Sequence, residues 1–522
     1  MRRQVSGDDR RASTQVFITG SEAYPELERA FLAAETEIHA SFRIFDPRTR
    51  LRSAEGLAVG ESWSDLIAHV LQKGVAIRMI LSDFDPVGRS ALHRGTWRSV
   101  RLWKAAAASA GPDARLEIHA AMHPAQSGTL VRMAFWWKAK RKTDRICAWL
   151  NEMPEAERHE VLEDMPGLSD RIVTLADGRC RARRFLLPHL FPATHHQKLA
   201  VFDRRKLYIG GLDLDERRYD TPNHDRPGDQ TWHDVQMMME GPVVTEAQAH
   251  LDSFLDVVEG KNPPAKARRF LRTLSRRRRI ALWHYGPKPV AHELRQAHEA
   301  LCSRAQNLIY LETQFFRDLS LARHLVRAAE RNPQLGLILI LPAAPEDVAF
   351  DNRAGIDARF GEYQQARALR MLRKAFGARI FIGGAAQPRS MTRQTSHDRD
   401  RLQGAPLIYI HAKVSIFDDV SAIVSSANLN GRSLSWDTEA GVYLNSARDV
   451  AELRRRAMGH WLPADAAPAF FDVSGAPAAW AALARENHRA APENRRGFIL
   501  PYDITVAEDF GQNAPGVPDE MM

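Results

Sequence analysis

The segment His196-Gln-Lys198-Leu-Ala-Val-Phe-Asp203 decides the fold, because the chain contains its pattern twice. The second copy reads His411-Ala-Lys413-Val-Ser-Ile-Phe-Asp418. After six residues, each copy continues with two small residues and a short polar side chain, as Gly210-Gly211-Leu-Asp213 and as Ser425-Ser426-Ala-Asn428. Two copies of one pattern with the same internal spacing indicate a duplicated unit.

Chance does not explain these two copies. The chain has 522 residues with 20 His and only 12 Lys, against 61 Arg. From these frequencies an H-x-K-x4-D pattern is expected roughly 0.03 times in a chain of this length. Both copies have lysine at the same position, although arginine is five times more common than lysine in this chain.

Apolar runs alternate with helical patterns in the same order on both sides of the duplication. The first half predicts strands at 15–19, 37–45, 75–83, 115–121, 199–202, 206–210 and 235–239, with helices at 23–35, 62–73 and 97–108. The second half predicts strands at 308–313, 335–341, 379–382, 408–410, 414–417, 422–424 and 440–444, with helices at 292–305, 319–330 and 363–376. This alternation predicts an α/β fold of two homologous α/β/α sandwich lobes with mixed, largely parallel sheets. A pseudo-two-fold axis would relate the lobes and place the active site at their interface.

Composition divides the chain further. The formal net charge of the chain is +9, and the stretch from Lys261 to Arg279 alone carries the same charge, with nine bases and no acid. With Pro263 and Pro264, this stretch predicts a solvated linker, and a contact for phosphate-bearing partners is the alternative. We expect a basic tail at 1–14, a first lobe at 15–260, a linker at 261–284, a second lobe at 285–462 and a C-terminal extension at 463–522.

The first lobe carries a helical insertion at about 123–194 that the second lobe lacks. It contains Trp136 and Trp137 close to Lys138, Lys140, Arg141 and Lys142. Aromatic residues beside basic ones suit a membrane interface, and buried helix packing of the Trp pair is the alternative.

The motif itself carries chemistry suited to a phosphate group. Histidine serves as nucleophile or as general acid and base, and lysine supplies a compact positive charge to phosphate oxygens. On a strand, residues two apart share a face, so we expect each His-Lys pair to point together. The small residues Gly210, Gly211 and Ser426 would let the backbone approach an anion, and Asp213 and Asn428 would add polar contacts.

No metal or other cofactor is expected, since lysine and histidine provide the positive charge. Three unevenly spaced cysteines exclude a Cys-rich zinc site. His195, His224 and His233 fit no compact zinc spacing, so hydrogen-bonded roles are expected for them.

These motifs resemble the two signature motifs of the phospholipase D superfamily, and the surrounding text resembles its eukaryotic-type branch. The resemblance includes Arg218-Tyr-Asp-Thr-Pro-Asn-His224, Trp232-His-Asp234, Glu240-Gly-Pro242, Ile309-Tyr-Leu-Glu-Thr-Gln-Phe-Phe316 and Ser426-Ala-Asn-Leu-Asn-Gly-Arg-Ser433. It covers about residues 15–460, without the lipid-binding regulatory domains of plant and animal members. Ser425 departs from the usual Gly of the second motif, and its Cβ would crowd the phosphate.

The resemblance implies a phospholipase D mechanism with a covalent phosphohistidine. His196 would be the nucleophile and His411 the general acid and base, with the swapped assignment open. Lys198, Lys413 and Asn428 would stabilise the pentacoordinate phosphorus, while Asp234 and Glu439 are candidates to accept the far N–H of a catalytic histidine. Asp203 and Asp418 would have structural, ion-pairing roles. Glu312, Gln314, Trp136 and Trp137 are candidates for substrate binding.

The expected function is hydrolysis of the distal phosphodiester of glycerophospholipids such as phosphatidylcholine, with transphosphatidylation as a further outcome. A cardiolipin-synthase-like phosphatidyltransferase, a nucleic-acid phosphodiesterase and a non-enzymatic binding protein that uses only the basic stretch are the alternatives. We expect a monomer that acts on a phospholipid membrane surface without obligate nucleic acid. Without an apolar run long enough to span a bilayer or an N-terminal signal, the expected location is cytoplasmic with peripheral membrane contact, or secreted without a classical signal peptide.

Overall fold

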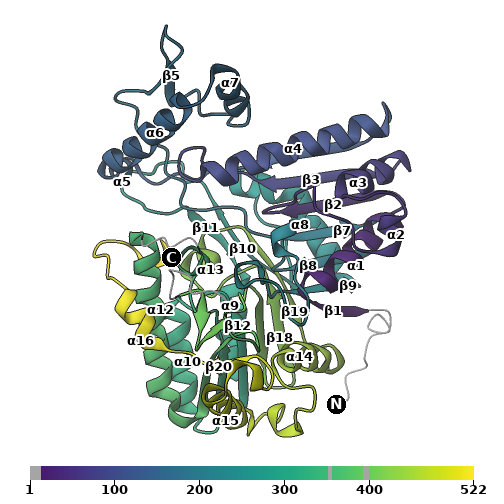
Figure 1. The fold of residues 1–522 in the computed structure, drawn as a ribbon, viewed down its shortest axis with the longest axis vertical. Coiled ribbons are helices and arrows are strands. Elements are labelled where there is room, and N and C mark those ends of the chain that lie inside the picture. The colour runs from purple at the N-terminus through teal and green to yellow at the C-terminus, as the bar shows by residue number, and fades with distance from the viewer. Residues whose placement is uncertain (1–12, 351–354, 392–398, 522) are drawn as a thin grey trace.

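The computed structural model describes residues 13–350, 355–391 and 399–521. Within these ranges the chain forms two lobes, each built on one large sheet (Figure 1). The expected basic tail at 1–14 lies almost entirely outside the described residues. Over the described residues, no helix combines the length and apolar character needed to cross a membrane.

The first lobe contains a seven-stranded sheet in the order β1-β9-β8-β7-β2-β3-β4. Its strands are β1 (Thr14–Ile18), β2 (Glu37–Phe42), β3 (Ala76–Ser82), β4 (Leu116–Ala121), β7 (Leu199–Phe202), β8 (Lys206–Gly210) and β9 (Val235–Glu240). The helices that accompany it are α1 (Thr19–Ala33), α2 (Ala54–Leu57), α3 (Trp63–Gln72), α4 (Ser90–Ala110) and α8 (Pro242–Glu259).

The second lobe repeats this order as β10-β19-β18-β17-β12-β13-β14 and adds β11 and β20 at its two edges. Its strands are β10 (Phe270–Arg276), β11 (Lys288–His292), β12 (Leu308–Thr313), β13 (Gly336–Ile340), β14 (Ile380–Ala385), β17 (Lys413–Phe417), β18 (Ser421–Ser425), β19 (Glu439–Leu444) and β20 (Ile499–Pro501). Its helices are α9 (Glu293–Arg304), α10 (Leu319–Arg331), α11 (Glu346–Ala349), α12 (Ile356–Phe376), α13 (Gly431–Ser435), α14 (Ala447–Trp461), α15 (Ala476–Arg489) and α16 (Ile504–Phe510). The shared order of seven strands confirms the duplication.

The sheets are mixed, but the prediction that they are largely parallel is wrong. Among the named strands of the described residues, two pairs in each large sheet are parallel, β2–β3 and β3–β4 in the first and β12–β13 and β13–β14 in the second. These pairs are joined by helical crossovers, whereas the motif strands β7, β8 and β9 and their counterparts are consecutive in the sheet and pair antiparallel, with a tight connection between β7 and β8 and between β17 and β18.

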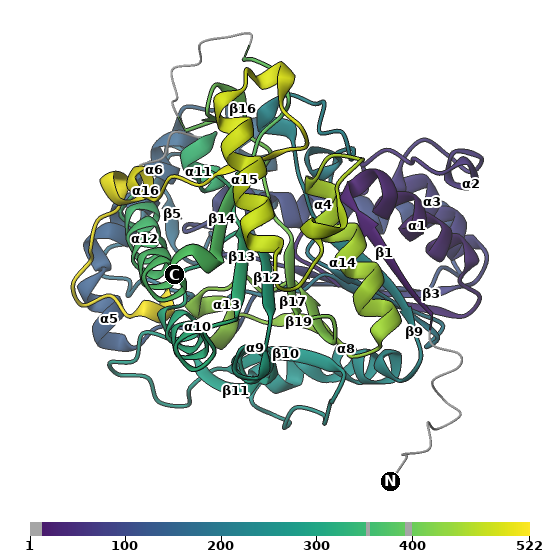
Figure 2. The same ribbon diagram turned by 90° about the horizontal axis from the view of Figure 1, so that it is seen from below.

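Helices cover the outer faces, and the two lobes share a core. Figure 2 shows α14 and α15 lying across the strands of the second sheet. One hydrophobic core includes Leu199 and Ile209 of the first lobe together with Val414 and Val424 of the second. Strand β8 packs against β18 and β19, so the motif strands of both lobes meet at the centre of the molecule.

Two expected segment boundaries need correction. The expected linker at 261–284 contains β10, the counterpart of β1, whose alternating apolar residues are hidden among arginines. Arg272 on this strand is buried and donates to Glu293 Oε1 at 2.6 Å. The residues after 462 are not an extension beyond the lobe, because β20 pairs with β14 and α15 packs its buried Trp480 into the core.

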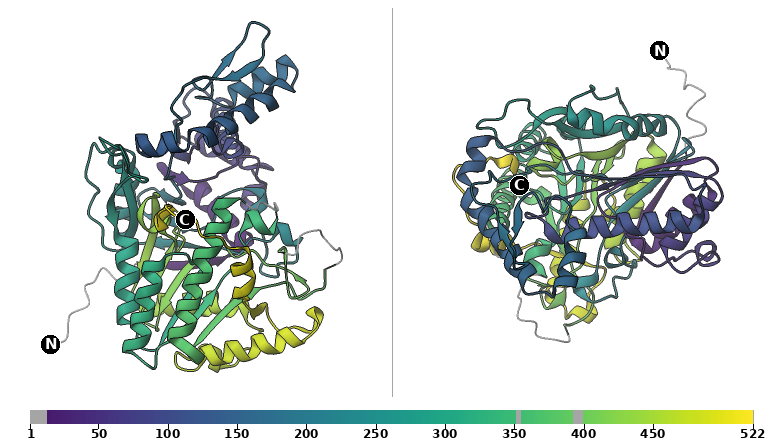
Figure 3. Two further views of the ribbon diagram at one scale, coloured as in Figure 1. Left: turned by 90° about the vertical axis from the view of Figure 1, so that its left-hand side faces the viewer. Right: turned by 90° about the horizontal axis from the view of Figure 1, so that it is seen from above.

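The segment at 123–194 folds into α5 (Thr129–Ala134), α6 (Trp136–Asn151), α7 (Glu155–Glu163) and a small hairpin, β5 (Ile172–Thr174) with β6 (Cys180–Ala182). A second small hairpin, β15 (Arg401–Leu402) with β16 (Ala405–Pro406), precedes the second motif. Figure 3 shows the insertion rising from one end of the molecule. We refer to residues 123–194 as the insertion.

Candidate active site

The two motif histidines lie in extended segments that cross between the lobes. His195 forms a parallel bridge with Thr438, and Ile410 forms one with His233. The amide of His196 donates to the Thr438 carbonyl and that of His411 to the His233 carbonyl, both at 2.8 Å. Exchanging the lobes converts one set of contacts into the other, which is the local two-fold relationship that the duplication predicts.

The predicted strand at 408–410 is therefore wrong: Ile410 forms only an isolated bridge, and the regular strand begins at Lys413. Each lysine lies close to the histidine of its motif, and Lys413 Nζ is 3.0 Å from His411 Nδ1. Both histidines line the pocket, while Lys198 and Lys413 are buried behind them. Each ammonium group donates to the carbonyl oxygen of the histidine two residues earlier.

Each histidine is held by a carboxylate of the opposite lobe. His196 Nδ1 lies 3.0 Å from Glu439 Oε1, and His411 Nδ1 lies 2.6 Å from Asp234 Oδ2. A carboxylate on Nδ1 fixes the tautomer that carries its proton there, and leaves Nε2 with a lone pair. Among the described residues, neither Nε2 has a hydrogen-bond partner.

Burial sets the electrostatics of these pairs. Desolvation holds the pKa of both histidines well below the ordinary value of 6.5. Nearby bases lower it further, chiefly Lys198 and Arg43 for His196, and Lys413 and Lys198 for His411. Desolvation raises the pKa of Asp234 to about 7 and of Glu439 to about 8. It lowers the pKa of Lys198 to about 8 and of Lys413 to about 7.

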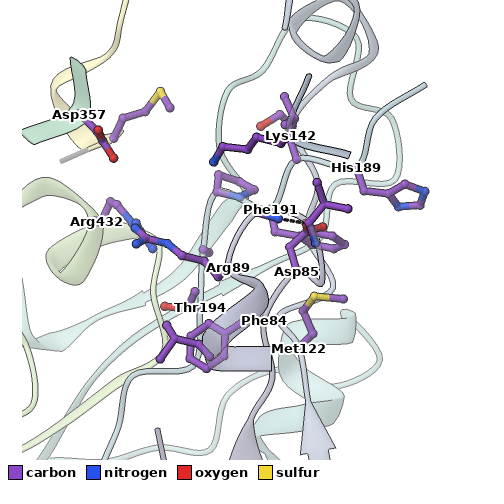
Figure 4. Close-up of a pocket in the computed structure, with 18 of the residues that line it drawn as sticks. Phe84, Asp85, Arg89, Met122, Lys142, His189, Phe191, Thr194, Asp357 and Arg432 are labelled. Carbon is purple, nitrogen blue, oxygen red and sulfur yellow. Dashed lines mark hydrogen bonds between the residues drawn. The ribbon is translucent and has the colours of Figure 1, made fainter. Parts of the chain in front are cut away.

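A pocket of about 610 Å³ opens onto both histidines. Its inner end is lined by His196, His411, Asn428, Gln314 and Trp232. Its outer walls come from the start of α4, the insertion and the start of α12, as Figure 4 shows for Arg89, Lys142 and Asp357. The site is thus one pocket at the lobe interface, and residues of the insertion form part of its outer wall.

The small residues after each motif make room for the carboxylates. A Cβ added to Gly211 would lie 2.2 Å from Asp234 Oδ1, and one added to Gly210 would lie 1.9 Å from Gln236 Oε1. In the second lobe Ser426 Oγ instead donates to Glu439 Oε2 at 2.5 Å. The Cβ of Ser425 faces Gly441, where a second Cβ would lie only 2.5 Å away, so the Ser425 side chain packs against a glycine of β19.

The motif aspartates have a structural role as acceptors of backbone amides, and no salt bridge to either is found among the described residues. Asp203 accepts the amides of Glu35, Thr36 and Glu37, at 2.8–3.1 Å. Asp418 accepts those of Gln306, Asn307 and Leu308, at 2.7–2.9 Å. Both carboxylates therefore fix the backbone that enters the first parallel strand of each lobe. Asp213 likewise accepts the Ile44 amide at 2.9 Å, with Lys198 Nζ 3.9 Å from its other oxygen.

The four substrate-binding candidates divide evenly. Gln314 and Trp136 line the pocket, and Gln314 accepts a hydrogen bond from Asn428 Nδ2 at 3.2 Å. Glu312 does not line it; its carboxylate is buried and accepts from Tyr310 and Trp461. Trp137 points away and is 68% exposed, so the buried interpretation of the Trp pair is wrong for this residue.

Sequence reasoning missed three pocket residues. Arg43 follows β2 and lies over Phe84, at 5.6 Å from the ring centroid. Arg432 pairs with Asp437 at 3.1 Å, and the Trp232 ring packs on that of His411 at 4.7 Å. A charged residue directly after an apolar strand was the available signal for Arg43. Nothing in the spacing indicated the stacking of Trp232.

A second histidine group lies at the interface, and His195 is not part of it. His224, His233 and His460 place one ring nitrogen each within 4.8 Å of the others. His224 Nδ1 lies 2.7 Å from Asp220 and its Nε2 lies 2.8 Å from His460 Nε2, a contact of hydrogen-bond length. His233 Nε2 lies 2.5 Å from Glu312 Oε1.

Comparison with known sequences places this site in context. Residues 299–461 match the domain family described as cardiolipin synthase, PLD-like domain. Phospholipase D1 of Schizosaccharomyces pombe is 23% identical over 333 residues, which span 48% of this chain and 24% of the relative. Phospholipase D alpha 1 of Nicotiana tabacum is 24% identical over 371 residues, which span 48% of this chain and 45% of the relative. The matched region covers less than half the length of each relative.

Solved structures also resemble the chain. Phosphatidylserine synthase of Haemophilus influenzae aligns over 85% of both chains with 12% identity and a TM-score of 0.44. Polyphosphate kinase of Porphyromonas gingivalis aligns over 86% of this chain and 46% of its own, with 12% identity and a TM-score of 0.42.

Proposed function

The chain belongs to the phospholipase D superfamily of phosphodiesterases, and from this membership we propose that it cleaves the distal phosphodiester of glycerophospholipids. The products would be phosphatidic acid and the free head-group alcohol. The observation that carries the proposal is that two histidines line one pocket while each Nδ1 is held by a carboxylate of the opposite lobe.

In the proposed first step, His196 Nε2 attacks phosphorus. The N–P bond forms as the P–O bond to the head group breaks, and protonated His411 gives its proton to the leaving oxygen. In the second step, His411 removes a proton from water, the water oxygen bonds to phosphorus, and the N–P bond breaks. A primary alcohol in place of water would give a phosphatidyl alcohol by the same route.

The surrounding charges suit this reaction. A phosphodiester gains negative charge on its oxygens as phosphorus becomes pentacoordinate, and fixed positive groups stabilise that charge. Arg43 and Arg432 line the pocket, and Lys198 and Lys413 lie directly behind the histidines. Asn428 adds an amide at the pocket wall.

One assay tests the proposal against its rivals. The protein is incubated with phosphatidylcholine vesicles and separately with single-stranded DNA, each with and without a primary alcohol. Release of choline, with a phosphatidyl alcohol when alcohol is present, supports the proposal, and loss of both products in His196→Ala and His411→Ala ties them to the site. DNA cleavage without lipid turnover would contradict it.

The same assay separates hydrolysis from transfer. A cardiolipin-synthase-like transferase would form phosphatidyl alcohol when an alcohol is present, and it would release little phosphatidic acid with or without the alcohol. We propose the hydrolytic reaction at a phospholipid surface by a monomer, because one chain supplies both histidines and both carboxylates of the pocket.

A further inference from the structure

The outer part of the pocket has a positively charged wall that the catalytic steps do not use. Arg89, at the start of α4, lines it together with Lys138 and Lys142 of α6. Figure 4 shows the charged ends of Arg89 and Lys142 directed toward the open space of the pocket. The insertion is what brings α6 to this position, so the wall is specific to the first lobe.

This wall is not neutralised by salt bridges. Within the described part of the chain, Arg89, Lys138 and Lys142 have no acidic group within salt-bridge distance. Other bases of the same pocket do: Arg171 pairs with Asp85 at 2.7 Å, Arg432 with Asp437 at 3.1 Å and Lys140 with Asp144 at 2.6 Å.

The acids that face the wall leave it positive. Glu346, Asp347 and Asp357 line the same pocket, and Figure 4 shows Asp357 across the open space from Lys142. Glu346 is paired with Arg217 at 2.9 Å. Desolvation and the charges of Arg89 and Lys138 lower the pKa of Lys142, and Asp357 only partly offsets them.

The positive charge continues inward to the catalytic histidine. Arg43 and Arg432 line the same pocket as Arg89, Lys142 and His196. A ligand anchored at the wall would therefore extend along a row of cations to the reacting phosphorus. Among the described bases of the pocket, Arg432 is paired with Asp437, whereas Arg43 and the three wall residues have no acidic partner within salt-bridge distance.

The lining also contains a group of apolar side chains that suits a lipid. It includes Phe84, Met122, Val131, Phe135, Leu186 and Phe191. A nucleic-acid site would instead be expected to present exposed polar and basic side chains along the path of the phosphate backbone. The combination of an apolar channel with an anion-binding wall favours an amphiphile with a charged head group.

On the basis of the proposed function, we propose that Arg89, Lys138 and Lys142 form a subsite for a second anionic group, a phosphate carried by the head group of the substrate lipid. The substrate class is then an anionic glycerophospholipid with a phosphate-bearing head group. A quaternary ammonium head group would be repelled by the same wall.

The test compares two lipids with identical acyl chains, phosphatidylinositol 4-phosphate and phosphatidylcholine, dispersed at low mole fraction in a nonionic detergent. The wild-type protein should have a kcat/KM about tenfold or more higher for the phosphate-bearing lipid, as expected for charge-assisted hydrogen bonds. In the double variant Arg89→Gln/Lys142→Gln, kcat/KM should fall about tenfold for that lipid and should not fall for phosphatidylcholine. Lys142→Arg should retain the preference.

The matched control is Arg141→Gln, which removes one exposed charge from the same helix outside the pocket lining. It should leave both lipids unchanged. Equal losses on both lipids in the double variant would overturn the subsite while leaving the proposed function intact. Absence of any lipid turnover by the wild type would overturn both.

Two further arms identify the source of the phosphate. If hexadecylphosphonate in the micelle stimulates phosphatidylcholine turnover and the double variant abolishes that stimulation, the wall binds a neighbouring amphiphile rather than the substrate's own head group. If the double variant instead loses cleavage of single-stranded DNA while no lipid is turned over, the subsite serves nucleic acid. Either result would overturn the assignment.

Discussion

His196 Nδ1 lies 3.0 Å from Oε1 of Glu439, a residue of the opposite lobe. The reciprocal pair, His411 with Asp234, has the same cross-lobe arrangement at 2.6 Å. Neither lobe therefore contains a complete histidine–carboxylate pair, although each contains one of each residue. Assembly of the interface is a condition for activity, and this dependence leads to the first prediction.

Glu439→Gln and Asp234→Asn should each reduce kcat by about a hundredfold or more, because the amide no longer fixes the tautomer that presents a lone pair at Nε2. The measurement is turnover of a monomeric short-chain phospholipid, with the pH profile of kcat recorded for each variant.

A purely structural role for these carboxylates would give a different result. The loss of kcat would then follow a loss of folded protein, and the pH profile of the remaining activity would match the wild type. Glu452→Gln, on the exposed surface of α14, is the control and should leave kcat unchanged.

The activity should have an acidic optimum. The reaction needs one neutral and one protonated histidine, and burial with neighbouring bases holds the pKa of both His196 and His411 well below 6.5. As pH rises above these values the general acid loses its proton, so kcat/KM should increase as pH falls from 8 toward 6. An optimum above pH 7.5 would show that the histidines titrate in a different environment.

Asp418→Ala should destabilise the fold by about 3 kcal/mol, since three backbone amides, including that of the buried Leu308, lose a charged acceptor. Urea unfolding followed by fluorescence measures this change. Asp419→Ala removes an exposed carboxylate at the next position and should cost little. Equal stability of the two variants would refute the structural role of Asp418.

The exposed apolar residues around the insertion should dock on a bilayer. Trp137 is 68% exposed and Trp283 is 64% exposed. Hydrogen bonds from Gly128 and Leu130 to His284 and Leu282 fix the loop of Trp283 against the start of α5. Trp137→Ser/Trp283→Ser should weaken binding to anionic vesicles by about tenfold in a sedimentation assay.

The same double variant should turn over a monomeric short-chain lipid normally, because neither tryptophan lines the pocket. Val420→Ser removes a distant exposed apolar side chain and should leave vesicle binding unchanged. Unaltered vesicle binding of the double Trp variant would place the membrane contact elsewhere.

The sequence predicted the duplication and the central strands because both depend on local patterns that occur twice. It could not predict the direction of most strand pairs, because parallel and antiparallel strands have similar apolar sequences. The antiparallel pair β7 and β8, joined by a short turn, and the parallel pair β2 and β3, joined by a helical crossover, are an example. Strand β10 was missed because Arg272 occupies a buried position, where its ion pair with Glu293 and its hydrogen bond to the Ala265 carbonyl compensate for the burial.

At the site, the reactive residue types followed from the motif, whereas their partners did not. Asp234 and Glu439 could be selected as carboxylates after each motif, but the exchange between lobes depends on bridges such as His195 with Thr438. The positive wall depends on the fold of the insertion, which has no counterpart in the second lobe to guide its interpretation.

The most direct test of the central claim is to locate the covalent intermediate. In His411→Asn, which lacks the group that activates water, reaction with a short-chain phosphatidyl-p-nitrophenol, whose leaving group needs no general acid, followed by alkaline quenching and peptide mass spectrometry should show a phosphatidyl adduct on His196. The His196→Asn variant should show none. An adduct on His411 in the His196→Asn variant, with none on His196 in the other, would contradict the assignment of the nucleophile.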